Sequence, residues 1–178
     1  MRGADDLTLV ERAREGSRDA AGELFRRHWE AVWKAAYALV GRRALADDVA
    51  QEAFVRAFAA LDQFDEQRPL APWLKRIAVN RAIDELRSER RLRVVEGGEA
   101  ATPESGTEGQ EPEDAVVSAV QRLDVGKRVV VVLHFWLGYS LRQVAELLAV
   151  PPGTVASRLS RALAELRADL EVDRVNSA

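Results

Sequence analysis

A stretch of 19 residues near the middle of the chain restricts the fold more than any other feature of the sequence. Residues 96–114 contain four glycines, two prolines and seven acidic residues. Such a segment has too little apolar surface to offset the conformational entropy that folding removes. We therefore expect a disordered acidic linker over residues 96–112, with one small domain before it, residues 1–95, and another after it, residues 113–178.

The rest of the chain is rich enough in apolar residues to form cores, since 47% of its 178 residues are hydrophobic. This length holds one ordinary domain or two small ones and excludes a large multidomain enzyme. The absence of cysteine excludes disulfides, thiolate metal ligands and a cysteine nucleophile. No apolar run approaches the roughly 18 residues that span a bilayer, and the N-terminus lacks the apolar core of a secretory signal. We expect a cytoplasmic protein that does not bind membranes.

Hydrophobic periodicity predicts four helices before the linker. Apolar residues recur there at helical spacing, with Gly16 and Gly41 as stop signals and Ser17 as an N-cap. Prolines at 69 and 72 suit the first turn of the fourth helix. The expected helices cover approximately residues 7–15, 18–40, 45–61 and 72–93.

After the linker the pattern is again helical, with helices expected near residues 113–123 and 127–137 and two more beyond them. The run of four valines at 129–132 would also suit a strand. We predict a helix because the sequence offers no second strand for it to pair with. The predicted fold class is therefore all-α, with a four-helix domain and a helix-turn-helix domain joined by the linker.

The helix-turn-helix is predicted from the segment that follows Ser140. Apolar residues line one face of a short helix that Ser140 caps, and one face of a longer helix after the turn at 149–153. The longer helix carries polar residues on its opposite face, beginning at the end that enters the major groove of DNA: Thr154, Ser157, Arg158 and Arg161. A basic stripe alone often marks only a solvated face, but with the preceding helix and turn it predicts DNA recognition.

A second basic cluster lies on the predicted fourth helix. Residues 67–95 carry eight basic and three acidic residues, an excess sufficient to hold phosphate groups. The residues that share one face by their spacing are Arg76, Asn80, Asp84, Arg87 and Arg91. Trp73 and Phe64 supply flat surfaces on which an unstacked base could lie. For Trp73 considered alone, we favour packing in the core.

The sequence offers little for catalysis. Its two histidines, His28 and His134, lie within apolar helices, where a partly buried structural histidine is a simpler interpretation than a ligand. Adjacent acids such as Asp47 and Asp48 lack the further ligands or the pocket that a metal or catalytic site requires. We predict that the protein is not an enzyme, binds no cofactor or metal, and acts on no small-molecule substrate.

The sequence resembles bacterial RNA polymerase sigma factors of the extracytoplasmic-function group, within the sigma-70 superfamily. Three strings carry the resemblance in order: DDVAQEAFVRAF at 47–58, WLKRIAVNRAIDELRSERR at 73–91 and GTVASRLSRALAELR at 153–167. It covers nearly the whole chain, with sigma region 2 at about 5–95 and region 4 at about 113–172. The resemblance implies an alternative-sigma initiation factor that directs core RNA polymerase to specific promoters.

The resemblance also implies roles for individual residues. The predicted third helix would dock on the clamp helices of the polymerase large subunit through Asp48, Gln51, Glu52 and Arg56. The fourth helix and the loop before it would read the minus-10 element as melted strand through Phe64, Arg68, Trp73, Arg76, Asn80, Arg87, Arg90 and Arg91. The helix-turn-helix would read the minus-35 element as duplex through Thr154, Ser157, Arg158 and Arg161, with Arg142 and Gln143 on the DNA backbone. The implied partners are core RNA polymerase, promoter DNA and an anti-sigma protein.

Two other functions stay open at this point. A transcriptional regulator would bind DNA by its helix-turn-helix and use the N-terminal helices to sense a ligand or to dimerise, without polymerase. An all-helical adaptor would use its first domain only to clamp another protein. The basic fourth helix beside Trp73 argues against both alternatives, because neither function needs to capture single-stranded DNA.

Overall fold

The computed structural model describes the main chain of residues 5–95 and 115–176 and the side chains of residues 5–88 and 116–169. The described residues form eight α-helices and no strand, so the predicted all-α fold is confirmed. The predicted linker, residues 96–112, lies outside the described residues. None of the described helices combines the length and the apolar character that crossing a bilayer requires.

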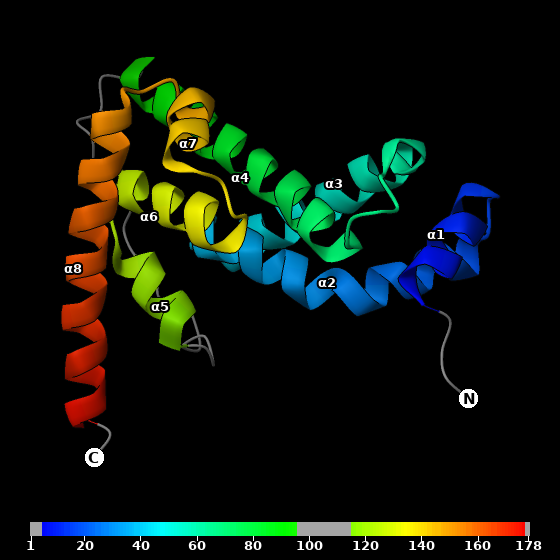
Figure 1. Ribbon diagram of the computed structural model, residues 1–178, viewed down its shortest axis with the longest axis horizontal. Helices are drawn as coiled ribbons and strands as arrows, with labels where there is room; N and C mark the ends of the chain where they lie inside the picture. The colour runs from blue at the N-terminus through cyan, green and yellow to red at the C-terminus, as the bar shows by residue number, and fades with distance from the viewer. Residues whose placement is uncertain (1–4, 96–114, 177–178) are drawn as a thin grey trace.

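Four helices and a 3₁₀ turn form the N-terminal domain (Figure 1). Their bounds are α1 Asp6–Arg14, α2 Arg18–Val40, α3 Arg43–Ala59, η1 Leu61–Gln63 and α4 Leu70–Val95. Local signals fix several ends: the Ser17 hydroxyl accepts from the Ala20 amide, and Gly41 ends α2 in the left-handed region at φ 70°. Helix α4 begins two residues earlier than predicted, at the first position after Pro69. Helix α2 packs against both α3 and α4.

The C-terminal domain contains the remaining helices: α5 Ala115–Arg122, α6 Val125–Val131, the π-helical turn η2 Val132–Trp136, α7 Leu141–Leu148 and α8 Pro152–Asn176. The four-valine run is helical, as predicted. In the π-helical turn, which periodicity did not predict, the Leu137 amide donates to the Val132 carbonyl at 3.3 Å. Ser140 and Gln143 form a capping box at the start of α7, and α7 with α8 makes the expected helix-turn-helix.

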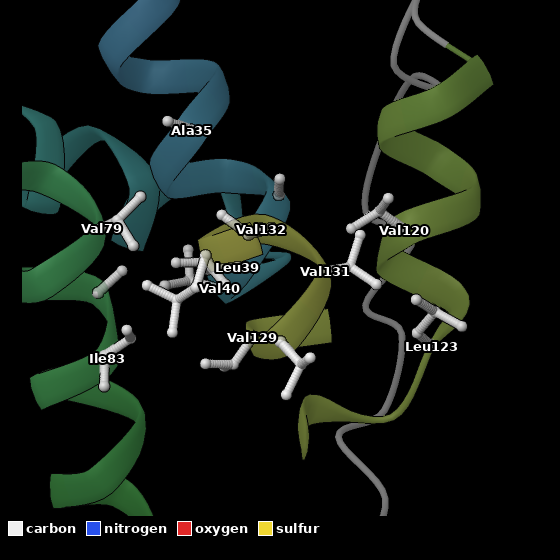
Figure 2. Packing of buried hydrophobic residues seen from close by; sticks show 14 of the residues in the cluster. Ala35, Leu39, Val40, Val79, Ile83, Val120, Leu123, Val129, Val131 and Val132 are labelled. Carbon is white, nitrogen blue, oxygen red and sulfur yellow. The ribbon is translucent and has the colours of Figure 1, made fainter. Parts of the chain in front are cut away.

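The two domains share one hydrophobic core, which forms around α6. Figure 2 shows Val132 directed toward α2, where Leu39 lies, and Val131 directed toward α5, where Val120 lies. Val132 and Leu39 are each 0% exposed. Residues 129–133 are all buried, so this segment needs cover on several sides, and α2, α5 and α8 all contact α6.

A buried arginine joins the domains beside this core. Arg128, in the middle of α6, is 6% exposed. Its Nη1 donates to the Leu39 carbonyl of α2 at 2.7 Å, and its Nη2 donates to the carbonyls of Gln121 at 2.5 Å and Leu123 at 3.0 Å. Burial lowers the pKa of the Arg128 guanidinium, which nonetheless stays protonated. The same interface contains a bond from Gln121 Nε2 to the Tyr37 carbonyl at 2.9 Å.

Candidate nucleic-acid and polymerase interface

The polar face of α8 lies at the N-terminal end of the helix, where the sequence predicts DNA contact. Ser157 and Arg161 are exposed, while Thr154 and Arg158 are half-buried. The Ser157 hydroxyl donates to the Thr154 carbonyl at 3.0 Å, which leaves its oxygen able to accept a further hydrogen bond. The Arg158 guanidinium lies against Gly126 of α6, where an added Cβ would sit 3.5 Å from it. The helix therefore presents both donors and acceptors outside the core.

Helix α7 supplies two further predicted contacts. Arg142 is exposed, and its Nε donates to the Glu146 carboxylate at 3.2 Å. Gln143 is also exposed, but its side-chain oxygen accepts from the Ser140 amide at 2.9 Å. Gln143 thus caps the helix, a role that is additional to the predicted contact with the DNA backbone.

The basic face of α4 is partly covered by the C-terminal domain. The Arg76 guanidinium carbon lies 5.4 Å from the Tyr139 ring centroid, a cation–π distance. Arg87 Nη2 donates to the Leu147 carbonyl of α7 at 2.9 Å, and Figure 1 shows α7 beside the C-terminal half of α4. Asn80 is half-buried, and its Oδ1 is buried without a described hydrogen-bond partner. Arg90 and Arg91 lie outside the residues whose side chains are described.

In the loop between α3 and α4, Phe64 does not offer the exposed flat surface that the sequence predicts. Phe64 is 4% exposed and packs against Trp73, with ring centroids 5.2 Å apart. No base can lie on the Phe64 ring in this structure, because Leu61, Leu70 and Trp73 gather with it in the core of the N-terminal domain. Trp73 is half-buried and packs against this core, as we expect for Trp73 considered alone. Arg68 is exposed and pairs with Asp65 at 3.2 Å.

The outer face of α3 carries the predicted polymerase contacts. Asp48, Gln51 and Arg56 are exposed, and Val55 lies among them with 68% of its surface exposed. Glu52 is half-buried and forms ion pairs with Arg81 of α4 and with Arg56 on its own helix. The hydrogen bond from Arg81 lowers the pKa of the Glu52 carboxyl, and Arg56 adds to the shift. Glu52 therefore ties α3 to α4 as well as belonging to this face.

Sequence reasoning missed four residues that shape these surfaces: Arg14, Val55, Arg128 and Tyr139. Two of them left a trace in the sequence. Val55 lies off the apolar stripe of α3, four residues after Gln51, and Arg128 directly precedes the apolar run at 129–133. Arg14 and Tyr139 act through partners 50 and 63 residues away, such as Phe64 and Arg76, and periodicity carries no signal for such contacts.

Both histidines have structural partners. His28 Nε2 lies 2.8 Å from an Asp6 carboxylate oxygen, which joins α2 to α1. His134 Nδ1 lies 2.7 Å from the Tyr139 carbonyl, where it supports the turn before α7. Each ring is partly buried, in agreement with the structural interpretation.

Comparisons with known proteins assign the two domains to a family. Residues 24–92 match Sigma-70 region 2, and residues 113–166 match Sigma-70, region 4. The chain is 31% identical over 176 residues to the ECF RNA polymerase sigma factor SigW of Bacillus subtilis, covering 90% of this chain and 94% of that protein. It is 35% identical over 182 residues to the RNA polymerase sigma factor CnrH of Cupriavidus metallidurans, covering 94% and 95% of the two chains.

Solved structures agree with this assignment. The structure of CnrH in complex with the cytosolic domain of CnrY matches with a TM-score of 0.54 and 33% identity, over 94% of this chain and 98% of that one. The sigma factor RpoE of Bartonella quintana, solved with the anti-sigma factor NepR, shares the fold with a TM-score of 0.56 and 24% identity, over 85% and 97% of the two chains.

The pair of region matches, in this order on an all-helical fold, defines a sigma factor of the sigma-70 type. The chain belongs to the extracytoplasmic-function group of these factors. Sigma factors are transcription initiation factors rather than enzymes, so the predicted family and the predicted non-catalytic class are both confirmed.

Proposed function

We propose that this chain is an alternative sigma subunit that binds core RNA polymerase and brings it to promoters through two separate DNA contacts. Region 2, residues 1–95, would bind polymerase and hold the melted minus-10 strand, and region 4, residues 113–178, would read the minus-35 duplex. The acidic segment 96–112 would join them, and the protein would work in the cytoplasm. The observation that carries the proposal is the presence of two basic helix faces, on α4 and α8, in different domains of one sigma factor.

The duplex contact is assigned to the N-terminal end of α8. Arg158 and Arg161 would donate to guanine edges or phosphates, and Ser157 and Thr154 would contact either kind of group. Arg142 and Gln143 of α7 would lie on the DNA backbone. Exposure of Ser157 and Arg161 in the present structure supports this assignment.

The melted strand is assigned to α4 and the exposed loop before it. Arg68, Arg76, Asn80 and Arg87 would face the strand, with Arg90 and Arg91 further along the helix. Half-buried Trp73 would also contribute, and Phe64 would support it through the contact between their rings. Arg76 and Arg87 are exposed, but they also contact Tyr139 and α7, so DNA bound to them would compete with these contacts.

Polymerase is assigned to the outer face of α3. Asp48, Gln51, Glu52 and Arg56 would meet charged groups of the clamp helices, and exposed Val55 would add an apolar contact at the centre of the face. An anti-sigma protein is a further proposed partner. Support comes from the RpoE structure, which holds the anti-sigma factor NepR, and from the CnrH structure, which holds part of CnrY.

The proposal is tested by mixing the purified chain with core RNA polymerase from its own organism. We expect a complex that is stable in gel filtration and that starts transcripts at a defined set of genomic promoters. Val55→Glu should weaken the complex by at least about tenfold, because a carboxylate would be desolvated in the interface. Leu7→Glu is the matched control, since Leu7 is an exposed apolar residue on α1. DNA binding without a polymerase complex would reject the proposal in favour of a regulator that acts alone.

A further inference from the structure

One arginine of α1 binds the backbone of the loop between α3 and α4. Arg14 lies at the end of α1, yet its Nε and Nη2 donate to the Leu61 carbonyl at 3.1 and 3.0 Å. Its Nη2 also donates to the Phe64 carbonyl at 2.9 Å, and its Nη1 pairs with Glu66. Asp62 lies 3.9 Å from its Nε. A single guanidinium therefore contacts four residues of a six-residue segment.

This geometry uses properties that only arginine has. The guanidinium is a flat fork with five donors in fixed directions, so it can bind two carbonyls and a carboxylate together. The carbonyls of Leu61 and Phe64 lie at the two ends of the short η1 turn, and the Leu61 carbonyl also accepts from the Phe64 amide at 3.1 Å. Binding both carbonyls fixes the path of the chain from Leu61 to Phe64.

The anchored segment leads directly into the exposed part of the loop. Leu61, Phe64 and Leu70 are buried, whereas residues 65–69 are all exposed. The loop is thus a short excursion whose first end is held by the core and by Arg14. Hydrogen bonds within the loop also fix its conformation, because the Gln67 and Arg68 amides donate to Asp65 at 3.0 Å each.

Arg14 is not needed to attach α1 to the domain. Leu9 and Val10 of α1 are 3% and 0% exposed in the core. At the other end of the helix, Asp6 contacts Arg27 and His28 of α2. Since α1 has these separate attachments, the bonds of Arg14 act chiefly on the loop.

We propose that Arg14 is a positioning residue for strand capture: it fixes the backbone of residues 61–66 so that exposed residues 65–69 meet the melted minus-10 strand in one conformation. This inference rests on the proposed function, which assigns the loop to that strand. Arg14 itself touches no DNA in this scheme. Its effect is on the step in which the strand is held, and neither minus-35 duplex binding nor polymerase affinity depends on it.

The test compares Arg14→Ala and Arg14→Lys with Arg12→Ala, an exposed arginine on the same helix. Each variant is assembled with core polymerase on a promoter that the unmodified holoenzyme opens, and opening is followed by permanganate reactivity of unpaired thymines. We expect both Arg14 variants to reduce opening by roughly tenfold, since lysine cannot bridge two carbonyls. Arg12→Ala should open the promoter normally, and all variants should retain polymerase affinity.

Hydrogen exchange in the chain without polymerase gives a second readout. Exchange at the Phe64, Gln67 and Arg68 amides should become faster in Arg14→Ala and stay unchanged in Arg12→Ala. Normal opening by Arg14→Ala, rescue by lysine, unchanged exchange, or an equal loss of polymerase affinity would each overturn the assignment. Failure of the unmodified holoenzyme to open any promoter would instead reject the proposed function, and the role of Arg14 with it.

Discussion

Helices α4 and α8 both carry basic faces, and the two faces differ in what contacts their arginines. On α4, Arg76 contacts Tyr139 and Arg87 binds the Leu147 carbonyl. On α8, Arg161 is exposed and Arg158 is half-buried beside Gly126. Arg76 and Arg87 stay exposed beside these contacts. The two faces therefore differ in their neighbours rather than in their exposure: Tyr139 and α7 contact the α4 face, and α6 contacts the α8 face.

The cause of the difference is the shared core around α6. Val132 and Leu39 are fully buried between the domains, and Arg128 binds the carbonyl at the end of α2. These contacts place α7 beside α4. The Arg158 side chain of α8 lies instead against α6 of its own domain. The proposed strand contact would therefore compete with the bond from Arg87 to α7 and with the contact of Arg76 with Tyr139, whereas Arg158 contacts only α6 of its own domain among the contacts described.

The largest expected effect concerns the basic face of α8. Arg158→Ala should weaken binding of the chain to its preferred minus-35 duplex by about 1 to 3 kcal/mol if Arg158 reads a base. The loss should be measurable without polymerase. When the base pairs of the duplex are changed one at a time, Arg158→Ala should remove the preference for a particular base at one position only. Arg167→Ala, further along the same helix, is the control. A uniform loss over all sequences would identify Arg158 as a phosphate anchor instead.

A smaller effect concerns the core that holds the two domains together and keeps α7 beside α4. Val132→Ala and Val131→Ala remove the same atoms from neighbouring buried positions, and each should lower the free energy of unfolding by about 1.5 kcal/mol. Only Val132 faces α2 (Figure 2), so only its substitution should separate the domains and increase binding of single-stranded DNA.

The separation can be measured by energy transfer between dyes at Ala59→Cys and Ser160→Cys, because the chain has no cysteine of its own. Both positions are exposed, one in each domain. Equal behaviour of the two valine variants would show that the core around α6 does not hold the domains together.

The smallest effect concerns the opposite side of α4, where Glu52 binds Arg81. The pKa of Glu52 is lowered in the folded protein, so its contribution to stability is present at neutral pH and is lost as the pH falls below about 4.3. Glu52→Gln should destabilise the chain at pH 7 by less than about 1 kcal/mol, because the pair is partly exposed. The difference should shrink in acid, as measured by urea denaturation between pH 3 and 7. A difference that does not depend on pH would contradict the ion-pair explanation.

Local features of the fold could be predicted from the sequence. Ser17, Gly41 and Ser140 set helix ends through bonds within four residues, and the valine run is helical, as the lack of a second strand signal in the sequence predicts. Contacts between distant residues could not be predicted. The burial of Phe64 and the contact of Arg76 with Tyr139 depend on how segments far apart in the chain pack together, and hydrophobic periodicity does not encode that arrangement.

The acceptors of Arg128 have a consequence for how the molecule responds to salt. All the hydrogen bonds described for this guanidinium go to main-chain carbonyls, which carry no net charge, and they lie away from solvent. Dissolved ions weaken attraction between exposed charges far more than they weaken such bonds. Rising ionic strength should therefore weaken DNA binding at the N-terminal end of α8 while the two domains remain in contact.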